Sequence, residues 1–426
     1  RNAVSGVKGA AAAQMGYSDT LLVSLCCGAN SWGLLVKPPP TLFTAHHHPP
    51  LMLCDRFTTC DSTATTFEVN MIMFSTRRLL PAVAGLAAIL QLLGARPTGA
   101  GEGADVFAYG TVDLRLSVND RQALEGNRQR RGNSPFSHIN LNLFADIVAN
   151  ERLTVFNHVL VDPAAATSIG SFLRSWVRYT AVVRPGFDLH LQMGKIPTPF
   201  GHFTERAYTD INPVLGYPLM YHYSSSLRKN QLPASNSDLL AHRGQGTPAA
   251  FTGYDGSSAG SSSGLPMIYD SCWDFGGSAV GSLWRFEYLA AVTLGSLSDP
   301  RANASDNNDG RQLAVRLGLV PFTGLLLRTS YARAPYLDRV IASGLAPGEQ
   351  VEDFRQEIIG VSAEYEWRHL SVIGEWADNR WESPNIHDGN GASQDLKVTG
   401  FYLEGRYKLQ PGWFVGGRYS GLRYGR

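Results

Sequence analysis

Residues 171–194 alternate apolar and polar side chains over two runs that are separated by a tight Pro185-Gly186 turn. The first run places Arg174 and Arg178 on one face and Val177 and Tyr179 on the other, and the second run repeats the alternation. A period of two is the signature of a β-strand with one apolar and one polar face. Each run is about ten residues long, roughly what a tilted strand needs to cross a bilayer. These residues therefore predict a hairpin of two amphipathic, bilayer-length strands.

The same pattern recurs along most of the chain and predicts thirteen strands, with short and long connections in strict alternation. The predicted strands are 106–118, 137–148, 152–162, 171–183, 187–195, 271–280, 284–296, 311–320, 324–334, 354–367, 369–379, 396–409 and 412–424. Short turns on one side and long loops on the other are typical of bacterial outer-membrane barrels. The expected fold is therefore all-β, a transmembrane antiparallel up-and-down β-barrel. Because such barrels have an even number of strands, we expect the natural protein to continue past Arg426 and to have 14–16 strands in all.

Composition and the N-terminal sequence divide the chain into three parts. Only 17% of the 426 residues are charged, against about 25% in a typical soluble domain. Residues 73–100 read as a secretory signal peptide, with Arg77 and Arg78 before a short apolar core. A signal should begin a protein, so residues 1–72 are interpreted as an upstream extension outside the mature product, and 101–426 as the barrel.

The extension holds four of the five cysteines and the run His46-His47-His48, but their spacing fits no zinc-ligand pattern. No c-type haem attachment motif, phosphate-binding loop or dinucleotide fingerprint occurs either. No cofactor and no metal site are therefore expected. The G-x-S-x-G sequence at 260–264 lies in a Ser/Gly-rich stretch and not between a strand and a helix, so no enzymatic activity is expected.

Charged side chains gather on one face of the predicted strands, opposite the apolar face. A Lys or Arg facing lipid at mid-bilayer costs about 2–4 kcal/mol, so the charged face should meet water in a lumen. The predicted pore-lining residues are Arg174, Arg178, Asp188, Arg285, Glu287, Arg316, Arg328, Glu364, Glu366, Glu404 and Arg406.

The long segment 196–270 is the strongest candidate for a functional loop, because connections of this length are functional or disordered in compact proteins. Its first half is aromatic and punctuated by proline. Two arrangements are open: the segment folds inward and narrows the lumen, or it caps the rim. The inward arrangement predicts a constriction loop that carries His202, Arg206, Asp210 and Arg228.

The passage from Leu191 to Gly201, which reads LQMGKIPTPFG, resembles the Gly-Lys/Arg…Pro-Phe-Gly passage of bacterial outer-membrane porins. It is similar to that of the phosphate-selective porin group, although the strands lack that group's dense Lys/Arg ladder. The resemblance implies a 16-stranded, often trimeric, diffusion pore.

The sequence thus predicts a porin of the bacterial outer membrane that passes small hydrophilic solutes or ions by passive diffusion. The alternative is a scaffold barrel that sheathes a c-type cytochrome in an electron conduit. The expected partners are outer-membrane lipid and lipopolysaccharide, small solutes and further copies in a homotrimer, with no nucleic acid.

Overall fold

The computed structural model describes most of the region after residue 103. Described are residues 104–114, 139–161, 170–206, 217–233, 264–269, 273–301, 304–384, 395–410 and 413–425, with the short pieces 26–27, 124–125, 129–130, 235, 239–240 and 243. The predicted signal peptide lies outside these residues, as does the predicted extension apart from Cys26 and Cys27.

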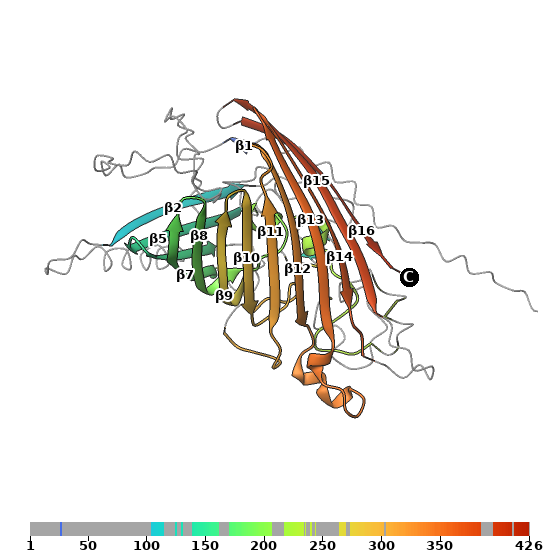
Figure 1. Ribbon diagram of the computed structural model, residues 1–426. Helices are drawn as coiled ribbons and strands as arrows, with labels where there is room; N and C mark the ends of the chain where they lie inside the picture. The colour runs from blue at the N-terminus through green and yellow to red at the C-terminus, as the bar shows by residue number, and fades with distance from the viewer. Residues whose placement is uncertain are drawn as a thin grey trace, which may run out of the picture.

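One large antiparallel sheet contains thirteen long strands among the described residues, in chain order from β2 to β16. The long strands are β2 (Asp105–Leu114), β5 (Ile139–Asn150), β6 (Leu153–Val161), β7 (Gly170–Arg184), β8 (Phe187–Pro197), β9 (Trp273–Leu283), β10 (Phe286–Thr293), β11 (Gln312–Leu319), β12 (Leu325–Pro335), β13 (Arg355–Trp367), β14 (Leu370–Trp381), β15 (Leu396–Gln410) and β16 (Trp413–Tyr424). Figure 1 shows them side by side in one curved sheet, from β2 and β5 at one edge to β15 and β16 at the other.

The smaller elements are few. The two-residue strand β1 (Cys26–Cys27) pairs with the start of β16, while β3 (Leu124–Glu125) and β4 (Gln129–Arg130) pair with each other. The short helices are η2 (Phe203–Arg206), α2 (Leu219–His222), η4 (Arg339–Gly344) and η5 (Val351–Asp353). No helix among the described residues is long and apolar enough to span a membrane.

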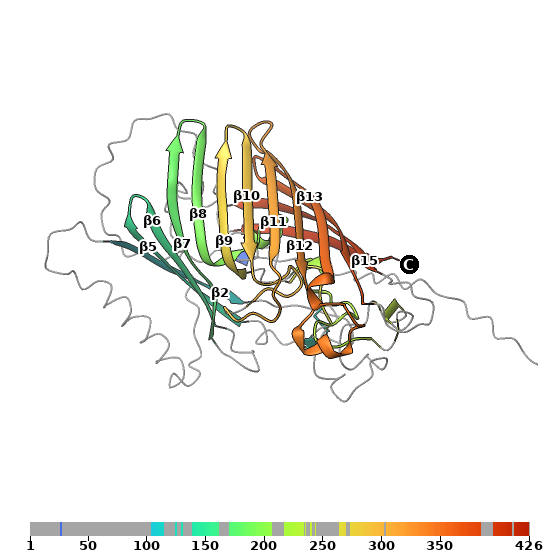
Figure 2. The ribbon, with the colours of Figure 1, turned by 60° about the horizontal axis from the view of Figure 1, so that its bottom comes forward.

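Every long strand pairs with its neighbours in sequence, so the predicted all-β, antiparallel up-and-down fold is confirmed. Within the described residues no register joins β2 to β16, and closure into a barrel stays a prediction. The tight turns lie at one end of the sheet, whereas η4 and η5, in the long connection between β12 and β13, lie at the other (Figure 2).

The two faces of the sheet differ as the alternation predicts. We call the face that packs against the long segment after β8 the inner face, and the opposite one the outer face. On β13, the inner face carries Ile358 and Glu364, which are buried, while the outer face carries Ile359 and Val361, which are half exposed. The main hydrophobic core therefore lies on the inner face, between the sheet and the segment that follows β8.

Candidate functional site: a loop fixed to the inner face

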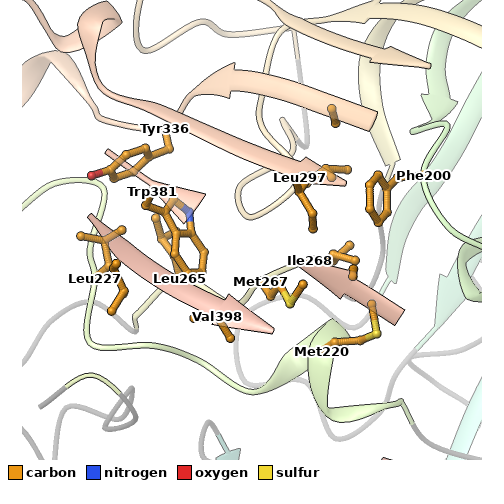
Figure 3. Close-up of a cluster of buried hydrophobic side chains, with 14 of the residues drawn as sticks. Phe200, Met220, Leu227, Leu265, Met267, Ile268, Leu297, Tyr336, Trp381 and Val398 are labelled. Carbon is orange, nitrogen blue, oxygen red and sulfur yellow. The ribbon is translucent and has the colours of Figure 1, made fainter. Parts of the chain in front are cut away.

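The described parts of the long segment after β8 lie on the inner face of β11–β16. A large buried cluster joins the two: Phe200, Met220 and Met267 of the segment pack with Trp381 and Val398 of the sheet. Figure 3 shows these side chains pointing toward one another from the segment and from the strands. Burial also raises the pKa of the Tyr223 phenol, which follows α2, and so keeps it neutral. The described part of the segment is thus a packed element on the inner wall.

Glycines on the wall make room for the side chains of the segment. A Cβ added to Gly360 on β13 would lie 2.9 Å from the Phe200 ring. A Cβ added to Gly400 on β15 would lie 2.8 Å from Cβ of Met220 and 3.0 Å from Sδ of Met267. Real Cβ atoms do not approach other atoms this closely. The segment is therefore seated in two recesses, at Gly360 and Gly400.

Gly201 belongs to a polar contact network that we call the latch cluster. Its members are Gly201, His202, Tyr221, Glu287, Arg316, Arg328, Ser330, Glu364, Glu375, Glu404 and Arg418. The backbone N–H of Gly201 donates to Oγ of Ser330 over 3.0 Å, and its carbonyl accepts from Nη1 of Arg316 over 3.2 Å. The residue has a φ of 67°, and a Cβ there would lie 2.0 Å from Oε1 of Glu375. Both the left-handed backbone and the close approach require glycine.

His202 joins three charged residues of the wall. Its backbone N–H donates to Oε2 of Glu375 over 3.2 Å. Its ring nitrogen Nε2 lies 3.1 Å from Oε2 of Glu364, and Nδ1 lies 2.9 Å from Nη1 of Arg328. A neutral imidazole protonated on Nε2 can donate to the carboxylate and accept from the guanidinium. Arg328 also pairs with Glu287 at 3.0 Å, which extends the latch cluster to β10.

Two buried carboxylates on neighbouring strands complete the cluster. Glu375 on β14 accepts a 2.8 Å hydrogen bond from the hydroxyl of Tyr221 in α2. Glu404 on β15 accepts from Nε of Arg418 on β16 over 2.7 Å, and the guanidinium of Arg418 lies 5.0 Å from the centre of the Phe203 ring. Charges are buried at low cost when they are paired and hydrogen-bonded. The wall charges here hold the segment in place.

Four predicted pore-lining residues, Arg316, Arg328, Glu364 and Glu404, are on the inner face but are no more than 8% exposed. The alternation predicts that these side chains meet water, and this is wrong for the four of them because they are buried. They are buried because the segment after β8, which is distant from them in the sequence, packs over them together with the groups that pair with their charges.

The other predicted residues fall into three places. Asp188 is buried and accepts hydrogen bonds from Ser282. Arg285 lies in the turn between β9 and β10, because β10 begins at Phe286, and donates to the Pro321 carbonyl; this corrects its predicted place on a strand. The following remain at least partly accessible: Arg174, Arg178, Glu287, Glu366 and Arg406.

The predicted constriction-loop residues are described in part. His202 and Arg228 are both 1% exposed, so neither side chain reaches open water. Nη1 of Arg228 lies 3.4 Å from Oε1 of Gln231. Asp210 and the side chain of Arg206 lie outside the described residues.

The wall of β5–β8 carries accessible charge on its inner face. Asp146, Arg174, Arg178 and His190 all face inward and are partly exposed. The guanidinium of Arg178 lies 4.7 Å from the centre of the Phe156 ring, and that of Arg174 lies over three aromatic rings. Stacking on rings holds the guanidinium groups in place while they keep their charge.

Tyr221 and Ser330 were not predicted as site residues, whereas the alternation does place Glu375 on the charged face of the strands. Tyr221 belongs to an aromatic Tyr-His-Tyr run that stands out in the sequence, but nothing local indicates its partner, 154 residues away. The inward-facing Gly360 and Gly400 give a readable signal, because glycine at such positions marks close approach of another segment. Among the described residues, no group of three or more His, Cys, Asp or Glu side chains could hold a metal ion.

No known protein-family model matches the chain, and no curated protein matches it either. Among solved structures it is similar to a refined porin structure, at 10% identity and a TM-score of 0.35, covering 75% of this chain and 84% of that one. A substituted variant of the Rh. blastica porin gives 11% identity and a TM-score of 0.32, covering 74% and 99%. The Salmonella typhi OmpF complex with daunomycin gives 11% and 0.30, covering 76% and 97%. Because these TM-scores are below 0.5, function has to be inferred from the sheet itself.

Proposed function

We propose that the protein is a porin of the bacterial outer membrane that passes small hydrophilic solutes or ions by passive, non-enzymatic diffusion. The observation that carries this proposal is the separation of the two faces of the sheet. Phe286, Leu317, Val361 and Leu403 on the outer face are 50–55% exposed. An apolar surface this extensive marks a protein or membrane interaction site, and its spread over successive strands favours lipid.

The register of β12–β16 supports a boundary between lipid and water on the outer face. Cross-strand partners in the middle are apolar or small, in the row Thr329, Val361, Trp376, Phe401 and Gly421. Four residues further toward the long connections, the row is Arg333, Glu357, Arg380 and Lys397. Charge on the lipid face costs most at the bilayer midplane and little near the interface. The charged row therefore fits the headgroup region at the end with the long connections.

The short-turn end also has the composition of a membrane interface. Trp284, Phe322 and Trp367 lie in or beside tight turns and are 53–83% exposed. Aromatic girdles occur at both interfaces of outer-membrane barrels, where rings lie at headgroup level. This arrangement matches short turns on the periplasmic side.

In the proposed mechanism, solutes pass along the inner face of β5–β8, beside the segment that is fixed to β11–β16. Asp146, Arg174 and Arg178 supply charge of both signs along this path, which orients solutes. The segment reduces the cross-section and so sets the size cutoff. The trimeric assembly that the porin resemblance implies is part of the same proposal.

Planar-bilayer recordings of the purified protein test the proposal. We expect stable conductance steps with a reversal potential in a salt gradient. Changing Arg174 and Arg178 to Glu should shift selectivity toward cations, since both side chains face the proposed path. Arg380→Glu is the matched control, because Arg380 is an arginine on the outer face and should leave the reversal potential unchanged.

Two results would contradict the proposal. Well-folded protein that gives no conductance would exclude a diffusion pore and favour the cytochrome-sheath alternative. An unchanged reversal potential in the double variant would place the path elsewhere.

A further inference from the structure

A row of inward-facing side chains crosses β2, β5, β6 and β7 in the order Phe107, Asp146, Phe156 and Trp176. Each residue is the direct cross-strand partner of the next, and direct partners lie on the same face of a sheet. Because neighbouring strands are about 4.8 Å apart, the backbones at Asp146 and Trp176 are about 10 Å apart, with Phe156 between them. The row therefore places a carboxylate and an indole on either side of a phenyl ring.

Two guanidinium groups flank Trp176 along β7. Arg174 precedes it by two residues and Arg178 follows it by two, so the three side chains share the inner face. The guanidinium of Arg178 lies 4.7 Å from the centre of the Phe156 ring, and that of Arg174 lies 5.2 Å from the Trp176 ring. A guanidinium has five N–H donors in a planar fork, which suits a carboxylate. We call these two arginines and the four residues of the row the mixed-charge row.

Asp146 supplies the opposite charge. It is partly exposed, and among the described residues its carboxylate makes no hydrogen bond or ion pair, although Arg174 and Arg178 are close enough for their charges to act on it. Its two cross-strand neighbours are Phe107, which is 58% exposed, and Phe156, which is partly exposed. A carboxylate between two phenyl rings suits an ammonium group, which pairs with the carboxylate and is attracted to the rings.

The indole of Trp176 offers a further donor on the other side of Phe156. The side chain is 8% exposed, and its Nε1 has no hydrogen-bond acceptor within the described part of the chain. A buried N–H without an acceptor costs about 1–3 kcal/mol. A carboxylate bound by the flanking arginines would bring an acceptor next to this indole.

The other titratable side chains on this wall leave its accessible charge balanced. Asp105 lies two residues before Phe107 on the same face and is exposed, so two accessible anions accompany the two arginines. His190 contacts Oγ1 of Thr180 over 3.1 Å. The buried titratable side chains, which do not reach the path, are His158, Asp188, Lys195 and Asp274. A simple anion is thus opposed by carboxylates and a simple cation by guanidinium groups, whereas a solute with both charges meets a partner for each.

We propose that the mixed-charge row binds zwitterionic amino acids that have an apolar side chain. The α-carboxylate lies against Arg174, Arg178 and the Trp176 indole, the α-ammonium lies against Asp146, and the apolar side chain packs on Phe107. This inference rests on the proposed function, because it names the class of solute that the path favours.

Equilibrium dialysis of the detergent-solubilised protein at neutral pH tests the site. The probes are L-phenylalanine, phenylpropionate, which lacks the ammonium group, and phenethylamine, which lacks the carboxylate. The wild-type protein should bind L-phenylalanine at least about tenfold more tightly than either of the others, the effect of one charge-assisted hydrogen bond. Glycine, which lacks the ring, should also bind more weakly than L-phenylalanine.

Two variants assign the charges to their partners. Asp146→Asn should lower the affinity for L-phenylalanine to about that for phenylpropionate, because the ammonium group loses its carboxylate. R174Q/R178Q should lower it to about that for phenethylamine. Glu366→Gln is the matched control, because Glu366 is an accessible inner-face carboxylate on β13 that lies outside the row, 3.9 Å from Arg406, and this variant should keep the preference.

Four outcomes would overturn the inference. Phenylpropionate that binds as tightly as L-phenylalanine would identify a plain anion site, and glycine that binds as tightly would exclude a role for the apolar side chain. An undiminished preference in Asp146→Asn, or an equal loss in Glu366→Gln, would place the site elsewhere. The comparison of probes on the wild-type protein needs no variant and so decides the matter even if a variant fails to fold.

Conductance measured in parallel separates this inference from the proposed function. Conducting channels without a preference for the zwitterion would refute the mixed-charge row alone. Zwitterion binding by a well-folded protein that does not conduct would refute the porin proposal alone.

Discussion

At the scale of single residues, the buried pair Arg418–Glu404 should matter far more for stability than the surface pair Arg380–Asp395. The first pair is 4% and 3% exposed, and the second is 46% and 21% exposed. Glu404→Gln leaves a buried guanidinium without its carboxylate, so we expect the free energy of unfolding to fall by about 3–5 kcal/mol. Asp395→Asn should cost less than about 1 kcal/mol. Urea unfolding in detergent, followed by tryptophan fluorescence, measures both, and equal losses would contradict the prediction.

Gly201→Ala should loosen the latch cluster without disturbing the strands. The substitution forces alanine into a left-handed backbone, at a cost of about 1–3 kcal/mol, and directs its Cβ at Glu375. We expect faster proteolytic cleavage of the segment after β8 while the far-UV circular dichroism spectrum is retained. Gly405→Ala is the control, since nothing lies within 4 Å of a Cβ there. Cleavage at the same rate in both variants would mean that Gly201 does not fix the segment.

At the scale of elements, the seating of the segment on β15 can be tested at its recess. Gly400→Val fills the space that Met220 and Met267 occupy, so the segment should move off the wall and change the size of the conductance steps. Gly374→Val is the matched control, because Gly374 lies on the outer face, where its nearest neighbour is 3.6 Å away. Conductance steps of wild-type size in Gly400→Val would show that the segment does not set the cutoff.

The elements themselves were predictable from the sequence to within a few residues. The hairpin of 171–183 and 187–195 corresponds to β7 and β8, because a period of two is local and strong. The exception of consequence is β10, which begins at Phe286, two residues after the predicted start at 284, and so leaves Arg285 in a turn.

The candidate site could be predicted only in part, for a physical reason. Alternation shows which side chains share a face, and it placed Arg328 and Glu364 together correctly. It does not show what covers that face, because the contacts of His202 with Glu364 and Arg328 span 162 and 126 positions. Burial of charge depends on these distant partners, and no local pattern records them.

At the scale of the whole molecule, the outer face should tolerate charge only near its rim. Val361 lies in the middle of β13 and is 50% exposed, while Thr399 lies on the same face of β15 next to the charged row. If the face meets lipid, Val361→Arg should reduce folding stability in lipid vesicles by about 2–4 kcal/mol, and Thr399→Arg by about 0–1 kcal/mol. Denaturant titrations in vesicles measure both. Equal and small losses would argue against a membrane-spanning sheet.

The seating of the segment after β8 also makes this protein a natural starting point for sensor engineering. Its fixed contacts come from Gly201, His202, Met220, Tyr221 and Met267. The sequence from 244 to 263 contains none of these anchors. It is flanked in the chain by Arg243, whose carbonyl accepts from the backbone N–H of Ser226, and by Leu265, whose N–H donates to the Leu227 carbonyl. If the protein conducts as proposed, a peptide that recognises an analyte could replace 244–263 and leave these anchors intact, so that analyte binding would be read as a change in current.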